Sequence, residues 1–223
     1  RIMNLPVKRY LLFKILALAV FHASVLPQAG KQLSFDDLRA VRIPESIALF
    51  PDGSELVYTL AESNAAGTTT NRTLMKVDIK TRASKPFLIA QVMAHSPKWS
   101  PDGRYVAFIS NDSSGAAQLW ISDNKGADAS QLTSESPVTS FEWSPAGNEI
   151  AYVSRSRTAR SSVIVEGTSP HTELLFKVTI EPRKIVRLTA EPGSGIGMSW
   201  SPKGDSIVYS AQASPGFYGG FES

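Results

Sequence analysis

Short runs of apolar residues recur along the chain, and each begins two or three positions after a turn signal. Val106-Ala107-Phe108-Ile109 is the clearest run. Its β-branched and aromatic residues favour a strand. Apolar residues do not alternate with polar ones in this run, so both faces of the strand are expected to be buried. The pattern therefore predicts sheets that are covered on both sides.

The turn before this run has a defined chemistry. Trp99-Ser100-Pro101-Asp102-Gly103 suits a type I turn, because proline presets φ at the second position and aspartate is tolerated at the third. Glycine at the fourth position accepts a positive φ. A glycine that closes a type I turn gives a hairpin with a bulge. The stretch predicts two antiparallel strands joined at residues 100–103.

The same unit occurs four times in the sequence. Its turn glycines, which are 50, 44 and 57 residues apart, are Gly53, Gly103, Gly147 and Gly204. The fifth residue after each glycine is aromatic, and the third is a large aliphatic residue. Strand repeats of about 40–50 residues are typical of a β-propeller with one blade per repeat. We therefore predict an all-β fold, a β-propeller of four-stranded antiparallel blades with about three full blades and part of a fourth.

Blade boundaries follow from the repeat. The partial propeller is expected over 46–223, with blades at about 46–92, 93–136, 137–192 and an incomplete 193–223. In the second blade we expect strands near Pro97–Ser100, Tyr105–Ser110, Gln118–Ser122 and Gln131–Thr133. The outer strands of the first and third blades are expected at Phe87–Ile89 and Ile185–Leu188. Three tryptophans are expected to fill the space between blades: Trp99, Trp143 and Trp200.

Two short segments precede the repeats. Residues 1–30 combine the basic pair Lys8-Arg9 with a mostly apolar stretch that is short for a membrane span. We interpret this segment as a signal peptide, with an uncleaved N-terminal anchor as the alternative. Residues 31–45 are predicted to be a short helical lead-in, capped by Ser34 and ended by Pro44.

Composition and charge exclude some classes of function. The formal net charge is +3, but four basic residues and no acidic ones lie in the first thirty residues. Without them 19 basic residues face 20 acidic ones, so the body of the chain is near neutral. The charge therefore does not indicate nucleic acid as a partner. Cysteine is absent, so the chain holds no disulfide and is compatible with an oxidising compartment.

We searched the sequence for catalytic chemistry and assign no catalytic, cofactor-binding or metal-binding residue. A nucleophile elbow needs Gly-x-Ser-x-Gly, and the nearest approach is Gly197-Met198-Ser199-Trp200-Ser201, in a predicted strand. Gly193–Gly197 lacks the dinucleotide-binding spacing and is interpreted as a link between blades. Asp52 and Asp102 are explained by turn chemistry. His22 lies in the targeting segment, and His95 and His171 are expected in loops, without metal-ligand spacing.

One basic cluster has two interpretations. Arg155, Arg157 and Arg160 occupy a predicted long loop of the third blade. Such a cluster is commonly a solvated loop, whereas a loop that faces a cavity or a partner domain would meet acidic groups there. Asn71-Arg72-Thr73 and Asn111-Asp112-Ser113 match glycosylation sequons, which matter only in a eukaryotic secretory host.

The repeat resembles a known family. Residues 99–110, followed by Gln118-Leu119-Trp120-Ile121-Ser122-Asp123 and Gln131-Leu132-Thr133, resemble the blade repeat of TolB-like propellers. The same repeat forms the N-terminal propeller of prolyl oligopeptidase family serine peptidases, especially the acylaminoacyl-peptidase and dipeptidyl-peptidase branches. Leu33-Ser34-Phe35-Asp36-Asp37-Leu38 directly before a degenerate Pro-Asp-Gly repeat resembles the start of such a peptidase more than it resembles TolB.

The resemblance implies a function. In such peptidases an α/β-hydrolase domain with the Ser-Asp-His triad follows the propeller, and peptides are the substrates. We therefore expect the non-catalytic propeller of a secreted or periplasmic serine peptidase, which shapes substrate access to a hydrolase domain absent from this chain. The expected partners are that domain and peptide substrates, with no nucleic acid, and with the membrane only through an uncleaved anchor. The alternative is a TolB-like periplasmic protein-binding propeller without enzymatic activity. No cofactor is expected in either case.

Overall fold

A computed structural model of the chain describes residues 42–63, 70–88, 93–156, 172–190 and 193–213. These residues form strands and turns without a helix, and all of them belong to one compact unit, Arg39–Ser223. Because the described part is entirely β, none of its segments is a helix able to cross a bilayer. The predicted signal segment 1–30 and the helix expected before Arg42 lie outside the described residues.

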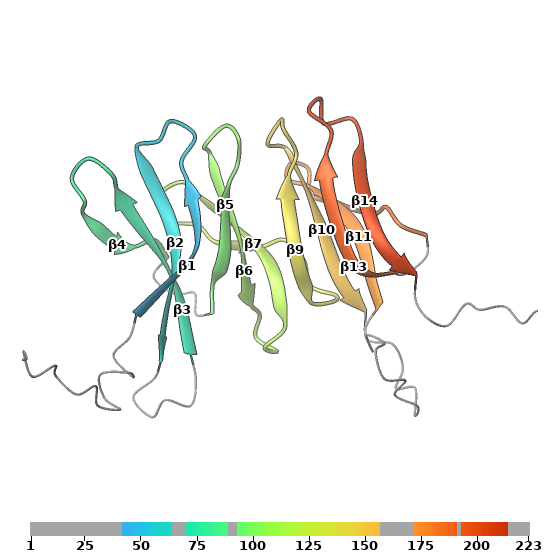
Figure 1. Cartoon of the computed structure of the whole chain (residues 1–223), viewed down its shortest axis with the longest axis horizontal. Coiled ribbons are helices and arrows are strands. Elements are labelled where there is room, and N and C mark those ends of the chain that lie inside the picture. Colours follow the sequence, from blue (N-terminus) through green and yellow to red (C-terminus); the bar gives the residue numbers. More distant parts are fainter. Residues whose placement is uncertain (1–41, 64–69, 89–92, 157–171, 191–192, 214–223) are drawn as a thin grey trace, which may run out of the picture. The chain divides into compact units, whose positions relative to one another are not determined.

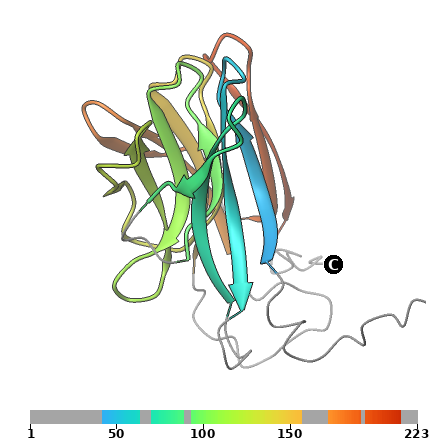
Figure 2. The ribbon, with the colours of Figure 1, turned by 90° about the vertical axis from the view of Figure 1, so that its left-hand side faces the viewer.

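The first two blades are separate four-stranded antiparallel sheets, as the repeat predicts (Figure 1). In each sheet the strands are hydrogen-bonded in chain order. The first sheet is formed by β1 (Arg42–Leu49), β2 (Glu55–Ser63), β3 (Thr70–Asp78) and β4 (Ser84–Pro86). The second is formed by β5 (His95–Trp99), β6 (Tyr105–Asn111), β7 (Ala117–Asp123) and β8 (Ser130–Gln131). In the view turned by 90°, the first sheet faces the viewer, and its strands β1, β2 and β3 lie side by side (Figure 2).

The third blade and the start of the fourth share one sheet. The third blade consists of β9 (Val138–Trp143), β10 (Glu149–Ser156), β11 (Thr172–Thr179) and β12 (Lys184–Arg187). The fourth blade contributes β13 (Gly193–Trp200) and β14 (Ile207–Ala213). A single residue pair, Glu173 with Gly193, connects β11 to β13 at the end of β11 that β12 leaves free. The fold is that of an incomplete propeller.

The predicted lead-in is wrong at its C-terminal end. Arg42 to Glu45 are not part of a helix or of its boundary, because they pair with β2 from Glu62 to Thr59 as the first half of β1. Pro44, which we interpreted as a helix terminator, is tolerated because β1 has a partner on one side only and proline is compatible with edge strands. The hydrogen bonds of the neighbouring strand outweigh the local signal.

The outermost strand of each blade begins earlier than its apolar residues suggest. We predicted Phe87–Ile89, Gln131–Thr133 and Ile185–Leu188, whereas the strands are β4, β8 and β12. The residue after each strand still donates its backbone N–H to the third strand of the same blade. These three bonds, each 2.8 Å long, are Phe87 to Leu74, Leu132 to Leu119 and Leu188 to Leu175. Phe87 and Leu132 are buried in the core, whereas Leu188 is 39% exposed.

The four predicted turns lie at one end of the sheets, along the upper edge of Figure 1. Each turn glycine has a positive φ, between 70° and 77°, and donates its N–H to the residue three positions before it. In the second turn Ser100 N–H also donates to Tyr105 O at 2.9 Å, which closes the hairpin. These bonds confirm the hairpins predicted from the turn chemistry.

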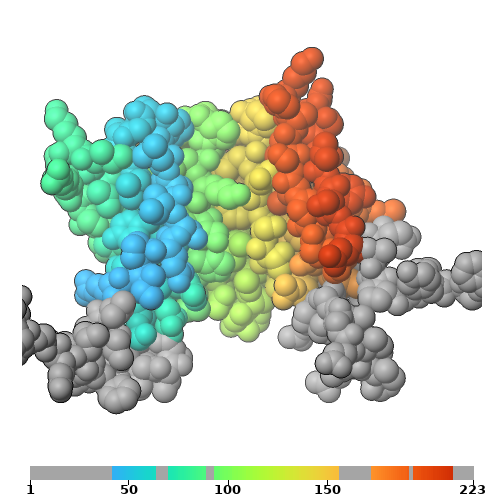
Figure 3. All heavy atoms as spheres, viewed as in Figure 1, coloured from blue at the N-terminus to red at the C-terminus, as the bar shows by residue number. Residues whose placement is uncertain are grey.

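Neighbouring blades pack through a buried aromatic and aliphatic core, and the blades follow one another in sequence order (Figure 3). Trp99 and Trp143 are buried at the first two interfaces and Trp200 is half-buried at the third. Each indole Nε1–H donates to a backbone carbonyl on the first strand of the preceding blade. The acceptors are Ala48 at 3.2 Å, Lys98 at 3.0 Å and Glu142 at 3.3 Å. The tryptophans therefore fill the interfaces, as predicted, and also join consecutive blades by a repeated hydrogen bond.

Candidate functional site

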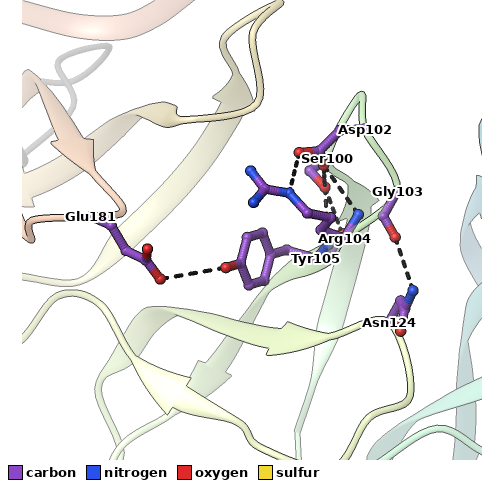
Figure 4. A network of polar contacts seen from close by, with 7 residues as sticks. All are labelled: Ser100, Asp102, Gly103, Arg104, Tyr105, Asn124 and Glu181. Carbon is purple, nitrogen blue, oxygen red and sulfur yellow. Dashed lines mark hydrogen bonds and ion pairs between the residues drawn. The ribbon is translucent and has the colours of Figure 1, made fainter.

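The aspartate of the clearest repeat, Asp102, is part of a turn network (Figure 4). Ser100 Oγ donates to Asp102 Oδ1 at 2.7 Å, and Arg104 Nε donates to Asp102 Oδ2 at 2.6 Å. Slight burial acts to raise the pKa of Asp102, but the hydrogen bonds from Ser100 and Arg104 outweigh it and lower the pKa. Tyr105 Oη contacts Glu181 of the third blade at 3.5 Å. Both carboxylate oxygens of Asp102 accept hydrogen bonds within the turn, which is the turn chemistry that the sequence predicts.

The two turns that lack this aspartate form an equivalent hydrogen bond with a different residue. Ala146 and Lys203 occupy the aspartate position in the third and fourth turns. There the serine hydroxyl donates to the residue after the turn glycine instead, to Asn148 at 3.2 Å and to Asp205 at 2.6 Å. The polar group has moved two positions along the chain, and the turn geometry is unchanged. This end of the sheets is therefore a structural rim.

The first strands also contain irregular backbone away from these turns. Both β1 and β5 contain a β-bulge there, between Glu45 and Ile47 and between His95 and Lys98. Within these bulges Ser46 and Ser96 have positive φ values of 41° and 54°, which are uncommon for residues other than glycine. The two serines lie seven residues before their turn glycines, so they are equivalent positions of the repeat. Strained backbone of this kind clusters at functional sites.

Three titratable side chains meet beside these bulges. Arg72 Nε on β3 contacts Glu45 Oε2 on β1 at 2.9 Å, and about a third of each side chain is exposed. His95, which we expected in a loop, lies in β5, where its Nδ1 is 3.0 Å from Ser96 Oγ. Burial lowers the pKa of His95, the charge of Arg72 lowers it further, and Glu45 acts in the opposite direction. The imidazole is therefore neutral at pH 7, between two charged groups.

Sequence reasoning missed this cluster because its members are far apart in the chain and belong to no known motif. The signal available was the repeat alignment, which places Glu45 and His95 eight residues before their turn glycines. Arg72 stands out in the sequence only as the middle residue of a glycosylation sequon. In the structure it forms an ion pair with Glu45, and its charge acts on His95 of the second blade.

A cavity of about 450 Å³ extends from these bulges toward the turns. It lies between β1 and β5, and its walls are residues 46–49 and 51 of the first blade and residues 96–101 of the second. Lys98 borders it, and its Nζ donates to Phe141 O at 2.7 Å. The cavity gives the strained serines contact with solvent-accessible space.

Other residues singled out from the sequence do not meet in a site. Arg155 on β10 pairs with Glu173 at 3.7 Å, while Arg157, Arg160, His22 and His171 lie outside the described residues. Gly193–Gly197, interpreted as a link, is instead the start of β13, whose pairing with β14 orders it. Ser199 lies in the same strand and is exposed. In the described ranges no group of three or more His, Cys, Asp or Glu side chains is arranged to hold a metal ion.

Comparison with known proteins shows similarity in sequence to a peptidase and in fold to β-propellers. No protein-family model matches it. Over 103 residues, 46% of the chain, it is 32% identical to the uncharacterized peptidase YuxL of Bacillus subtilis, of which it spans 16%. The described blades superpose on acylaminoacyl peptidase of Pyrococcus horikoshii with a TM-score of 0.61 and 20% identity, covering 76% of this chain and 28% of that one.

Two further structures share the fold. The β-propeller domain of the trilobed protease from Pyrococcus furiosus matches with a TM-score of 0.53 and 16% identity, over 75% of this chain and 48% of that one. TolB from Acinetobacter baumannii matches with a TM-score of 0.52 and 17% identity, over 78% of this chain and 39% of that one. The chain thus has the fold of a TolB-like propeller, is similar in sequence to a peptidase, and spans a minor part of each of these proteins.

Proposed function

We propose that this chain is the non-catalytic propeller portion of a secreted or periplasmic serine peptidase of the prolyl oligopeptidase family. The observation that carries the proposal is the 32% identity to peptidase YuxL over 103 residues, combined with a propeller fold. Likeness in fold alone does not select a function, because the same architecture serves both peptidases and TolB. The sequence similarity favours the peptidase.

The proposed role of the propeller is to shape the access of peptides to an α/β-hydrolase domain of the same polypeptide. Acyl transfer needs an activated serine beside a histidine, and a pair of donors for the oxyanion. The sequence has no Gly-x-Ser-x-Gly elbow to hold such a serine, and the contact between His95 and Ser96 lies within a β-bulge of β5. The chemistry is therefore assigned to the partner domain, and the chain contributes a wall of the substrate path.

The test compares this chain with a longer polypeptide that contains a hydrolase domain after it. Both are assayed with aminoacyl and dipeptidyl chromogenic substrates and with a fluorophosphonate probe. We expect turnover and labelling of the longer polypeptide, and neither for residues 1–223. A longer polypeptide that is inactive and unlabelled would overturn the peptidase assignment. Turnover by the chain alone that persists in the Ser199→Ala variant would overturn its non-catalytic role.

The second candidate is a TolB-like periplasmic propeller that binds proteins and catalyses nothing. The match to TolB from Acinetobacter baumannii, with a TM-score of 0.52, is the observation in its favour. The reading frame after this chain distinguishes the two candidates. A Gly-x-Ser-x-Gly elbow within an α/β-hydrolase supports the peptidase, and a stop codon after a closed ring of blades supports the binding protein.

A further inference from the structure

The polar cluster between the first two blades has unused binding capacity. Arg72 engages Glu45 through Nε alone, and the Nη groups of its guanidinium have no partner among the described residues. Two parallel donors from one guanidinium match the two oxygens of a carboxylate. The contact of Nε with Glu45 fixes the orientation of the guanidinium, and about a third of the side chain is exposed. The two Nη groups are therefore positioned to bind a ligand.

The register of the strands directs this fork toward the second blade. Glu45, Thr59 and Leu74 lie opposite one another across β1, β2 and β3, so their side chains share one face of the first sheet. Leu74 packs in the core with Trp99, so that face points to the second blade. Arg72 is two residues before Leu74 on the same strand and shares the face, because side chains alternate along a strand.

The surroundings favour a polar ligand over simple packing. Thr59 is fully buried on the same face, and its hydroxyl has no hydrogen-bond partner among the described residues. His95 offers a neutral imidazole whose Nδ1 is occupied by Ser96. The bulges of β1 and β5 interrupt the regular backbone ladder at the same place. An ion pair that served packing alone would not need two strained serines beside an open cavity.

From these observations we propose that Arg72, positioned by Glu45 and flanked by His95, binds a carboxylate group of a peptide at the bulges of β1 and β5. The carboxylate accepts hydrogen bonds from the two Nη groups and lies beside the imidazole. Only the peptide nature of the ligand rests on the proposed peptidase function. A carboxylate can come from the C-terminus of a peptide or from an Asp or Glu side chain, and the test separates these sources.

The experiment measures binding to the full chain by the NMR titration of His95, assigned with a His95→Gln variant. The probes are acetyl-Ala-Ala-Phe with a free C-terminus, the same peptide as its C-terminal amide, and acetyl-Ala-Asp-Phe amide. A bound carboxylate offsets the charge of Arg72, so the pKa of His95 is expected to rise on binding. The free acid tests a C-terminal carboxylate, and the aspartyl amide tests a side-chain carboxylate.

The variants separate recognition from folding. Arg72→Gln is expected to abolish the response, and Arg72→Lys to weaken binding about tenfold or more, because it keeps the charge without the fork. Arg104→Gln is the matched control, since Arg104 also engages a carboxylate through Nε but lies at the turn end of the second blade. It should bind as the unmodified chain does. Near-UV circular dichroism verifies that each variant retains its packed tryptophans.

The proposal is overturned if the pKa of His95 does not change with any probe, or if Arg72→Gln responds as strongly as the unmodified chain. It is also overturned if the Ala-Ala-Phe amide binds as well as its free acid and the aspartyl peptide binds no better than either. None of these readouts involves hydrolysis. The carboxylate site can therefore fail while the peptidase assignment stands, and a peptidase assignment that fails leaves the binding measurement intact.

Discussion

Single residues in this chain are constrained by what the neighbouring blade places next to them. Gly115 and Gly126 both have positive φ values, 83° and 78°. A Cβ on Gly115 would meet nothing within 4 Å, whereas one on Gly126 would lie 1.9 Å from the backbone oxygen of Phe87 in the first blade. The same residue type therefore serves a local turn in one place and an inter-blade contact in the other.

This difference predicts unequal costs for the same substitution. Gly115→Ala should lower the free energy of unfolding by about 1 kcal/mol, because it adds only left-handed strain. Gly126→Ala adds a clash with backbone that cannot rotate away, and should cost about 2–4 kcal/mol. Urea unfolding followed by tryptophan fluorescence measures both variants. Equal losses would show that the contact between the Gly126 turn and Phe87 contributes nothing.

A second residue-scale prediction concerns Tyr152. Burial, followed by the charge of Glu135, raises the pKa of the Tyr152 phenol to about 12. The folded state keeps this proton at a pH where the unfolded chain, with a pKa near 10, has lost it. Stability from this group is therefore complete below about pH 10 and is lost as the pH rises toward 12, by on the order of 2 kcal/mol.

Tyr152→Phe tests this pH dependence. Phenylalanine is expected to fit, since Phe108 occupies the equivalent position of the second blade and the stacking on Phe176, 5.4 Å between ring centroids, does not need the hydroxyl. The free energy of unfolding, measured in urea between pH 8 and pH 11, should decline less steeply for the variant. Parallel curves for the two proteins would mean that Tyr152 titrates normally in the folded state.

Elements repeat with more fidelity than the sequence does. Each first strand accepts an indole hydrogen bond from the next blade, although the acceptor residues are Ala48, Lys98 and Glu142. A charged pair also recurs, between Glu55 and Lys76 at 2.6 Å and between Glu149 and Lys177 at 2.9 Å. The second blade has Tyr105 and Ile121 at those places. Backbone geometry is what the repeats share.

The indole hydrogen bond gives a prediction at this scale. Trp143→Phe keeps an aromatic ring between the second and third blades but removes the donor to Lys98 O, and leaves a small void. We expect a loss of about 1–3 kcal/mol in unfolding free energy. Trp120→Phe is the control, since its Nε1 bonds Ser110 O within one blade and the side chain is half-exposed. Trp120→Phe should lower the free energy of unfolding by less than Trp143→Phe does. An equal loss would mean that the hydrogen bond between blades does not stabilise the fold more than one within a blade.

At the scale of the whole described unit, the two outer blades lack the cover that the inner ones have. Leu49 occupies the place of the interface tryptophans and is 57% exposed, and Ile47 beside it is 68% exposed. On the fourth blade Val208 is 74% exposed. The equivalent residues Trp99, Trp143 and Ala107 are buried. Contiguous apolar surface of this kind drives association.

We therefore expect the chain by itself to self-associate. The variant Ile47→Lys with Val208→Lys should reduce association, because it places charges on both exposed faces. Ile79→Lys is the control, since Ile79 is also exposed but lies beside the turn after β3. Light scattering coupled to size-exclusion chromatography measures the mass. A sharp monomeric peak of the unmodified chain would contradict this expectation.

The sequence by itself determined the hairpins and the propeller class. A turn such as Ser100–Gly103 depends on the φ preferences of a few consecutive residues. A run of apolar residues that does not alternate with polar ones predicts a strand buried on both faces. Only the tertiary structure decided where the outermost strands begin and that Arg42–Glu45 pair as a strand, because neighbouring strands supply those hydrogen bonds. The contact between Glu45 and Arg72, which are 27 residues apart in the sequence, and the proximity of both to His95 are also visible only in the tertiary structure. Such contacts depend on sheet register and blade packing, which no local pattern of residues encodes.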